Sequence, residues 1–241
     1  FSTPFDFTAV DFLEEIDTPW YKIASSELVD TPLIEYIAQT KKPTIISTGM
    51  GSKKEISDAV ESFLKFSSLD KLTLLKCTAE YPASPLDANL LTLNDLQKTY
   101  RCDVGLSDHT LTPYASLAAI GLGASVIEKH ITDSRKIPGP DSHFSLEPNE
   151  FAEMINMSKK LLETFGKVTY DCSLGEEVSK KYRKSLFCKK PLKIGDIITT
   201  EHVAIVRPAS GLAPKNYHYL LGTRAVRDIN VNEPYLASDL Q

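Results

Sequence analysis

The fold is decided most clearly by residues 103–130, which read DVGLSDHTLTPYASLAAIGLGASVIEKH. Two short apolar runs, 103–107 and 125–129, flank a segment over 113–122 that has the apolar spacing of a helix. A strand, a helix and a second strand in this order predict one parallel βαβ unit. Both predicted strands end in polar clusters, namely Ser107-Asp108-His109-Thr110 and Glu128-Lys129-His130.

The same alternation extends through the first 166 residues. Further strands are expected at Trp20–Ala24, Pro43–Ser47 and Leu72–Cys77, with the segment at Phe1 as a sixth. Helices are expected at Phe7–Ile16, Thr31–Gln39, Lys53–Phe66, Ala88–Tyr100, Pro113–Leu122 and Pro148–Phe165. Nearly every expected strand ends in polar residues, which is typical of a TIM (β/α)8 barrel with its site at the carboxyl ends of the strands.

A closed barrel needs eight strands and typically about 250 residues, whereas the repeating pattern ends near Gly166. The chain also opens at Phe1 without an initiator methionine, inside what looks like the end of a strand. We therefore expect the first two barrel units to be missing from this chain, and further residues upstream of Phe1.

The pattern changes after Gly166. Residues 167–184 are polar and of mixed charge, so they are expected to form a linker. From 185 to 241 short β-like pieces alternate with turn residues, for example Gly195–Ile198 and His202–Pro208. The expected organisation is a partial barrel over 1–166 and a small, mostly β domain over 185–241.

Composition excludes several classes of protein. The 241 residues are 42% hydrophobic and 24% charged, which is usual for a globular chain and argues against disorder. A formal charge of −5 argues against nucleic-acid binding, and no apolar run reaches the roughly 18 to 20 residues that cross a membrane. The four cysteines have no metal or disulfide spacing, so a soluble, reduced, cytoplasmic protein is expected.

His109 and His130 end successive strands and can approach each other at the mouth of the barrel. Neutral imidazole is a common metal ligand, and Asp108 or Glu128 could orient a ring. Two ligands would leave coordination positions open, as a catalytic Lewis acid requires. The alternative is a pair of histidines that hydrogen-bond only to the backbone.

Cationic and hydroxyl donors end several strands: Lys22, Ser25, Ser47, Ser107 and Lys129. Such donors hold phosphate or carboxylate oxygens strongly in a partly dry pocket. Taken singly, each could instead be a lysine that extends to solvent or a serine that caps the next helix. As a set in an acidic chain, they indicate a small phosphorylated substrate.

Three loop residues are further candidates. Glu27 could act as an acid or base beside Lys22, or be a carboxylate at a helix amino terminus. Tyr81 and Asp141 could contact a sugar, although Gly139-Pro140-Asp141 is equally a plausible turn. Neither a dinucleotide nor a Walker glycine motif occurs, and no Gly-x-Ser-x-Gly nucleophile motif occurs, so NAD and ATP binding are unsupported.

Several strings together resemble the sialic acid synthases, the bacterial nonulosonate synthases. They are Phe1-Ser2-Thr3-Pro4-Phe5-Asp6, Tyr21-Lys22-Ile23-Ala24-Ser25, Ser47-Thr48-Gly49-Met50, Tyr81-Pro82, Gly105-Leu106-Ser107-Asp108-His109-Thr110, Val126-Ile127-Glu128-Lys129-His130 and Gly139-Pro140-Asp141. The resemblance runs from end to end, and Val206-Arg207-Pro208 with Gly211-Leu212-Ala213-Pro214 is similar to the antifreeze-like (SAF) domain of the same family.

The resemblance implies condensation of phosphoenolpyruvate with an N-acylated hexosamine at a divalent metal, Mn²⁺ or alternatively Mg²⁺ or Co²⁺. By match of motif, His109 and His130 would hold the metal and act in catalysis with Glu27. Phosphoenolpyruvate would be bound by Lys22, Ser25, Ser47 and Ser107, with Thr3 as an additional candidate. The sugar or the attacking water would face Glu27, Tyr81 and Asp141.

In the family, the SAF domain of one subunit reaches over the partner's barrel. The resemblance therefore implies a domain-swapped homodimer in which Arg207 contacts the N-acyl group of the sugar. Phe144-Ser145-Leu146 and Leu212-Ala213-Pro214-Lys215 look more like pseudaminic acid synthases than N-acetylneuraminate synthases. Alternatives are N-acetylneuraminate or legionaminic acid synthesis, a synthase for seven- or eight-carbon sugar acids, and a noncatalytic sugar-binding or assembly subunit.

The match also has departures. No counterpart exists here for the family's first two strands, with their glutamate, lysine and glutamine, and Ala79 stands where some members have asparagine.

Overall fold

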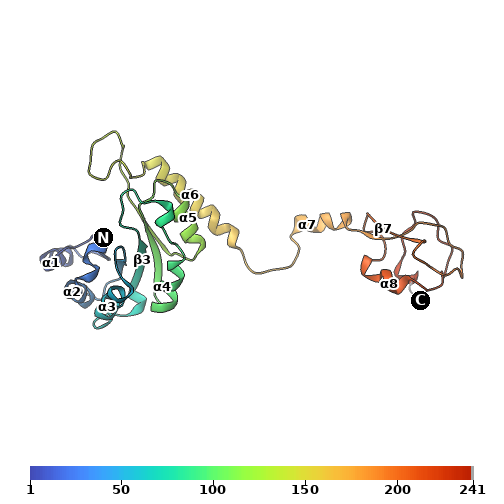
Figure 1. Cartoon of the computed structure of the whole chain (residues 1–241), viewed down its shortest axis with the longest axis horizontal. Coiled ribbons are helices and arrows are strands. Elements are labelled where there is room, and N and C mark those ends of the chain that lie inside the picture. Colours follow the sequence, from blue (N-terminus) through green and yellow to red (C-terminus); the bar gives the residue numbers. More distant parts are fainter. Residues whose placement is uncertain (240–241) are drawn as a thin grey trace. The chain divides into compact units, whose positions relative to one another are not determined.

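Five parallel strands form the centre of the first unit of the structure, a computed structural model that describes residues 1–239. They are β1 (Tyr21–Ile23), β2 (Thr44–Ser47), β3 (Leu72–Cys77), β4 (Asp103–Asp108) and β5 (Val126–Lys129). Each strand pairs with the next one along the chain (Figure 1). The five expected strands are found within one residue at each end, but the sixth is reduced to a single bridge between Ser2 and Tyr21.

Six helices follow or precede these strands. They are α1 (Phe7–Glu15), α2 (Thr31–Gln39), α3 (Lys53–Leu64), α4 (Thr92–Tyr100), α5 (Tyr114–Gly121) and α6 (Pro148–Phe165). Side chains cap several of them, for example Asp30 at α2 and the capping box of Ser52 and Glu55 at α3. The expected helix over 88–100 begins only at Thr92, because Asn89 has a positive φ of 43° that interrupts helical geometry.

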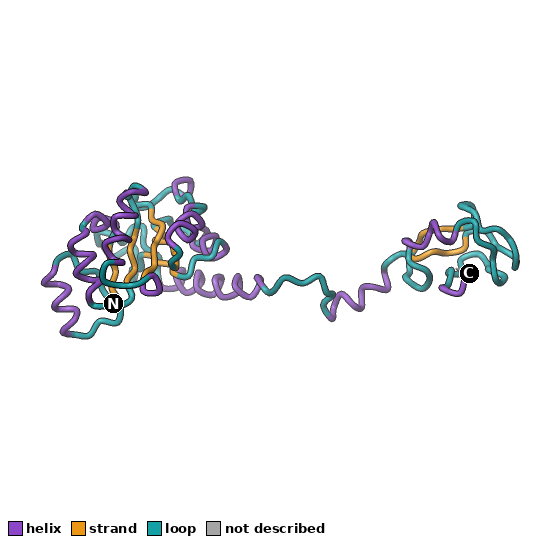
Figure 2. The backbone as a smooth tube through the Cα atoms, turned by 90° about the horizontal axis from the view of Figure 1, so that it is seen from below, coloured by secondary structure: helices purple, strands orange, loops and turns teal. Residues whose placement is uncertain are grey.

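The sheet is the curled wall of a partial (β/α)8 barrel. Its parallel neighbours follow one another in sequential order with helices between them, and Figure 2 shows helices beside the strands. The core between the layers joins strand residues such as Ile46 and Leu74 to helix residues such as Ile37 and Phe63. Alternate strand residues therefore face the inside of the barrel.

The first unit spans Phe1–Gly166. The second unit spans Lys167–Gln241, and the structure describes it as far as residue 239. Its antiparallel pair is β6 (Ser185–Cys188) and β7 (Val203–Val206), with α8 (Tyr217–Leu220) and its own core around Leu186 and Tyr235. Short 3-10 segments lie at Ser25–Val29, Leu69–Lys71, Pro85–Asp87, Lys180–Tyr182, Pro214–Asn216 and Ala237–Asp239. None of the helices in residues 1–239 combines the length and apolarity needed to span a bilayer.

The structure adds detail to two of the expected segments. The segment expected to be a linker contains α7 (Leu174–Ser179), which begins at a capping box formed by Ser173 and Glu176. The β-like piece expected over Gly195–Ile198 makes one bridge, between Ile197 and Arg224.

Candidate active site

A pocket of about 260 Å³ lies at the carboxyl ends of the five strands. Eight of the residues predicted from the sequence line it: Thr3, Lys22, Ser25, Ser47, Tyr81, Ser107, His109 and His130. Phe5, Ala24, Cys77 and Glu128 complete the lining. The sheet brings these side chains together because parallel strands all end at the same edge.

The two histidines face each other in this pocket. Their ring centroids lie 5.2 Å apart, with the rings tilted by 58°. The Nδ1 atom of His109 is 3.0 Å from the carbonyl oxygen of Thr78, which can only accept, so Nδ1 carries the hydrogen. The Nδ1 atom of His130 faces a carboxylate oxygen of Asp141 at 3.5 Å. Both rings therefore keep Nε2 available as a lone-pair donor.

Its surroundings favour the neutral form of His130. Burial, followed by the nearness of His109, lowers the pKa of His130 below its ordinary value. A neutral imidazole is the form that binds a metal. The lowered pKa of His130 therefore favours the form of its imidazole that can act as a metal ligand near neutral pH.

Aromatic side chains surround the pair of rings. The Tyr81 ring centroid lies 4.3 Å from that of His109, and the ring of Phe144 lies 4.9 Å from that of His130. Phe144 is only 4% exposed and also packs on Tyr81 at 5.4 Å. Burial raises the pKa of the Tyr81 hydroxyl, which therefore stays protonated and able to donate.

The anion donors line the same pocket. Lys22 is 6% exposed, and its Nζ donates to the carbonyl of Ile23 at 3.1 Å. Lys22 Nζ is also 3.5 Å from a carboxylate oxygen of Glu128, whose other oxygen accepts from Ser107 Oγ at 2.7 Å. Lys22 and Ser107 thus already bind one carboxylate, as donors to an anionic ligand would.

Ser47 is the clearest sign of a ligand. Its side chain is buried, with 2% exposure for the residue, and its Oγ has no hydrogen-bond partner among residues 1–239. A buried polar group without a partner is costly, so Ser47 Oγ marks a position where a ligand oxygen would complete the bonding.

The loop after β2 closes tightly over Ser25. The backbone N–H of Gly49 donates to Ser25 Oγ at 3.0 Å, and a Cβ at position 49 would lie only 2.7 Å from that oxygen. Glycine is therefore required for this approach. The hydroxyl hydrogen of Ser25 remains free to point to a ligand.

The remaining predicted residues lie elsewhere. Glu27 sits in the 3-10 segment Ser25–Val29, where its carboxylate accepts from Ser26 Oγ at 2.8 Å, and it does not line the pocket. Asp141 contacts the pocket only through His130. Arg207 follows β7 in the second unit and is exposed.

Two expectations about orientation were wrong. Lys129 does not reach the mouth of the barrel, because it lies between Glu128 and His130 in an alternating strand and so faces the helices. Neither Asp108 nor Glu128 holds an imidazole: Asp108 pairs with Lys129, and Glu128 pairs with Ser107 and Lys22.

Sequence reasoning missed Cys77 and Phe144 as parts of this site, and it assigned Glu128 to an imidazole rather than to Lys22 and Ser107. Glu128 lies two residues before His130 and hence on the same face of the strand, which is why it reaches the pocket. Cys77 ends β3 on the inner face, with its sulfur 3.9 Å from Nδ1 of His109. Phe144 comes from the loop after β5, whose path no local pattern predicts.

The residues present fit a metal with open coordination positions. Within the described part of the chain, no group of three or more His, Cys, Asp or Glu side chains could hold an ion by itself. Two imidazoles with available Nε2 atoms could supply two ligands, leaving the other positions to water or substrate. The donor set therefore suits a catalytic ion rather than a structural one.

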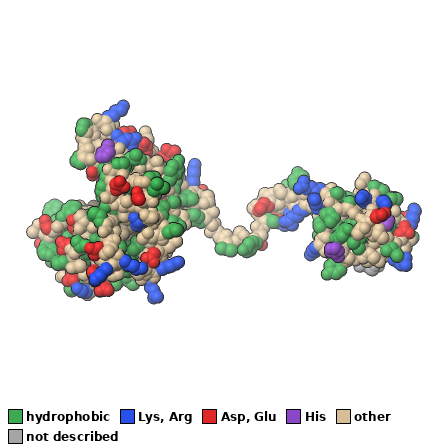
Figure 3. Space-filling view, in the orientation of Figure 1, with side chains coloured by type: hydrophobic (Ala, Val, Ile, Leu, Met, Phe, Trp, Pro, Cys, Tyr) green, Lys and Arg blue, Asp and Glu red, His purple; other side chains and the backbone are tan. Residues whose placement is uncertain are grey.

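On the face of the first unit that Figure 3 draws, basic and acidic side chains are interspersed. This face therefore presents no extended positive field that would attract an anion over a distance. Because the chain as a whole has a formal charge of −5, anion binding would rest on the local donors in the pocket.

Comparison with known proteins places the chain among relatives of one kind. The NeuB family model matches residues 1–170, and the SAF domain model matches residues 183–241. A pseudaminic acid synthase of Campylobacter jejuni is 39% identical over the whole chain and 70% of its own length. An N,N'-diacetyllegionaminic acid synthase of the same species is 37% identical over 96% of the chain and 70% of its own length.

Among solved structures, an N-acetylneuraminic acid synthetase of Leptospira borgpetersenii, in complex with citrate, aligns with a TM-score of 0.68 and 33% identity. That alignment covers 75% of this chain and 63% of the other. With a family match over most of its length and full-length relatives above 30% identity, the chain belongs to the NeuB family and carries a SAF domain.

Proposed function

We propose that this chain is a metal-dependent synthase that condenses phosphoenolpyruvate with an N-acylated hexosamine to form a nonulosonic acid and phosphate. The observation that carries the proposal is the convergence of paired imidazoles, a buried lysine and an unpartnered buried serine hydroxyl in one pocket. Relatives named as pseudaminic, legionaminic and N-acetylneuraminate-9-phosphate synthases support synthesis of a sialic-type acid.

Phosphoenolpyruvate would bind on the side of Lys22. Lys22 Nζ and the hydroxyls of Ser25 and Ser47 would supply donors to the phosphate and carboxylate oxygens, with Thr3 at the edge of the pocket. Ser107 would join them by turning its single hydroxyl hydrogen away from Glu128 Oε1. Low exposure of Lys22 and Ser47 strengthens these bonds, because little water competes there. The sugar would lie toward Tyr81, with Asp141 and Glu27 as candidates for contacts to the sugar or the attacking water.

In the proposed reaction, the electrons of the C2=C3 double bond of phosphoenolpyruvate form a bond from C3 to the aldehyde carbon of the open-chain sugar. The aldehyde C=O becomes a single bond, and its oxygen takes up a proton to become a hydroxyl. Water then adds at C2, and the bond between C2 and the phosphate oxygen breaks to release phosphate. His109 and His130 would hold a divalent ion, Mn²⁺ or alternatively Mg²⁺ or Co²⁺, through Nε2. Such an ion, when bound, polarises a carbonyl oxygen as a Lewis acid. Thr78 and Asp141 fix the direction of the two rings from behind.

The product we favour is pseudaminic acid. Phe144-Ser145-Leu146 supports this choice, as do relatives named as pseudaminic acid synthases at 37% and 39% identity. Legionaminic acid and N-acetylneuraminate are the alternatives. A panel of N-acylated hexosamines with phosphoenolpyruvate and Mn²⁺, read out by phosphate release and by mass of the product, separates the three.

The same assay tests whether the protein is an enzyme at all. Phosphate release that needs both the sugar and the metal, and that stops on chelation, is the expected result. Sugar binding by the folded protein without phosphate release from any member of the panel would instead support a noncatalytic subunit.

We extend the proposal to a domain-swapped homodimer in which Arg207 of one subunit contacts the N-acyl group of sugar bound by its partner. Replacing Arg207 with alanine is expected to raise the KM for the sugar about 10-fold or more, since one charged hydrogen bond is lost, and to leave the KM for phosphoenolpyruvate unchanged. An unchanged KM for the sugar would refute this part.

A further inference from the structure

A buried ion pair lies directly behind the two histidines. Asp108 and Lys129 are register partners at the ends of β4 and β5, and Lys129 Nζ lies 2.9 Å from Asp108 Oδ2. Their side chains are 1% and 2% exposed. Each is the residue immediately before a histidine of the pocket, and each turns away from the pocket toward the helices.

The pair also holds the backbone that follows His109. The N–H of Thr110 donates to Asp108 Oδ1 at 2.9 Å, and Lys129 Nζ donates to the carbonyl oxygen of Thr110 at 2.5 Å. Both polar backbone groups of Thr110 are therefore bound by the two charged side chains. Ser116 of α5 adds a hydrogen bond to Asp108 Oδ2 at 2.6 Å, which ties the pair to the helix layer.

Stability alone does not account for this arrangement. Removing two charges from water costs about as much as their attraction returns, so a buried ion pair is weak evidence for a stabilising role. What the pair does fix is geometry: His109 lies between Asp108 and Thr110, and His130 follows Lys129. The backbone positions of both imidazoles are thereby set relative to each other.

We propose that the Asp108–Lys129 ion pair is a positioning clamp that fixes the backbone positions of His109 and His130, and hence the separation of their rings, so that both can bind one divalent ion. The proposal rests on the proposed function, in which these rings are the metal ligands. Asp108 and Lys129 touch neither metal nor substrate, so they are positioning residues.

The test replaces both charges at once, with Asp108→Asn and Lys129→Met in one protein. Because no unpaired buried charge remains, the double variant is expected to keep most of the wild-type melting temperature, whereas either single variant loses more. Binding of MnCl2 alone is measured at fixed pH and salt from the loss of the free Mn²⁺ EPR signal. Affinity is expected to fall about 10- to 100-fold, as when other residues that orient metal ligands are changed.

A matched control removes the more accessible pair of Glu35 and Lys65, by Glu35→Gln and Lys65→Met; the Lys65 Nζ and Glu35 Oε1 atoms lie 2.6 Å apart, and the side chains are 57% and 29% exposed. The charges lost are the same, so unchanged Mn²⁺ affinity is expected there. If the Asp108 and Lys129 double variant does not fold, Ser116→Ala decides instead. Ser116→Ala removes one hydrogen bond to Asp108. A few-fold weaker Mn²⁺ affinity supports the clamp, whereas an unchanged Mn²⁺ affinity overturns it.

His109→Ala separates the proposed metal site from the proposed clamp. If His109→Ala loses Mn²⁺ binding but the folded double variant binds Mn²⁺ like wild type, the clamp is wrong and the metal site stands. If His109→Ala binds Mn²⁺ as tightly as wild type, the metal site itself is wrong, and the clamp falls with it.

Discussion

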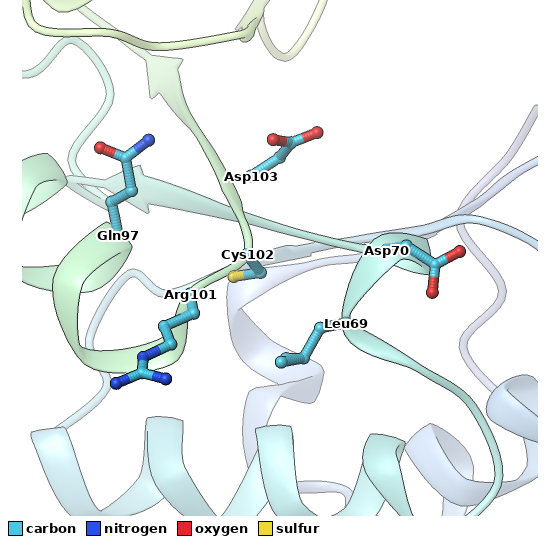
Figure 4. Close-up of a pocket in the computed structure, with 6 residues that line it drawn as sticks. All are labelled: Leu69, Asp70, Gln97, Arg101, Cys102 and Asp103. Atoms are coloured by element: carbon cyan, nitrogen blue, oxygen red, sulfur yellow. The ribbon is translucent and has the colours of Figure 1, made fainter.

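The two ends of the parallel sheet differ in what their pockets contain. At the amino ends of β3 and β4 lies an opening of about 660 Å³, lined by Leu69, Asp70, Gln97, Arg101, Cys102 and Asp103 (Figure 4). The pocket at the carboxyl ends is smaller, about 260 Å³. Only the smaller one combines paired imidazoles with a buried, unpartnered hydroxyl, so convergent chemistry rather than volume marks the site.

The groups at the amino end are poorly suited to catalysis. Burial raises the pKa of the Cys102 thiol to about 11, so it is not a thiolate nucleophile near neutral pH. Arg101 there is exposed. In barrels of this kind the amino end serves stability and the carboxyl end serves chemistry, and the two pockets follow that division.

The largest expected effect comes from the histidine pair. His109→Ala or His130→Ala removes a proposed metal ligand and should lower kcat/KM by about 1000-fold or more, or roughly 4 kcal/mol of transition-state stabilisation. Steady-state phosphate release measures this effect. Gln97→Ala, at the amino end, should leave the rate unchanged. Comparable losses at both ends would remove the distinction between them.

Ser47 provides a second test of the difference between the two ends of the sheet. Ser47→Ala removes a proposed donor to phosphoenolpyruvate, so the KM for phosphoenolpyruvate should rise about 10-fold or more. The melting temperature should stay equal or rise, because an unpartnered buried hydroxyl is also removed.

Ser67 provides the matched control, since its buried Oγ also has no partner within residues 1–239 but lies ahead of β3, away from the pocket. Ser67→Ala should not change the KM for phosphoenolpyruvate. If both variants raise this KM equally, the missing partner of Ser47 has no connection with a ligand.

Much of this contrast could be predicted from the sequence. Apolar runs that end in polar residues predicted the five strands and the shared edge at their carboxyl ends. This was possible because the spacing of apolar residues along a strand and the position of the strand's end are local properties of the sequence. Contacts made by loops were not predictable: Phe144 reaches His130 only through the path of residues 131–147. The start of α4 was missed because propensity favours helix at 88–91, whereas Asn89 adopts a left-handed conformation.

Lys129 illustrates an error that simple geometry could have prevented. Its position between two inward-facing residues already requires the opposite face. The partner of the Lys129 charge, however, is Asp108 in a different strand. Predicting this ion pair would have required the register of β4 against β5. Helix α7 was missed for another reason: its capping box was in the sequence, but six residues are too few for an apolar period.

A smaller effect is expected at the amino end. Arg101 ends α4 in a left-handed conformation with φ of 55°, where glycine is normally preferred. Arg101→Gly relieves that strain and should raise the free energy of unfolding by about 1 kcal/mol, measured by urea denaturation. Turnover should be unchanged, because only stability is expected to depend on this end. A loss of activity would contradict that assignment.

The smallest expected effect concerns how the carboxyl end is held. There the loop after β5 is tied to α6 by the bidentate pair of Arg135 and Glu150. This pair lowers the pKa of Glu150 to about 2 from an ordinary value of 4.5. Because the folded-state pKa is depressed, the pair stabilises the fold above about pH 5, and the contribution is lost as the pH falls toward 2.

Both side chains are substantially exposed, at 39% and 43%, so solvent screening reduces the contribution to about 0.5 kcal/mol. Glu150→Gln should therefore lower the free energy of unfolding by that amount at pH 7, and the difference from wild type should shrink in urea titrations at pH 3.5. A difference that grows on acidification would mean that Glu150 is not stabilised as the carboxylate. The carboxyl end would then be held by backbone contacts, such as Leu146 N–H to the carbonyl of His130, rather than by charge.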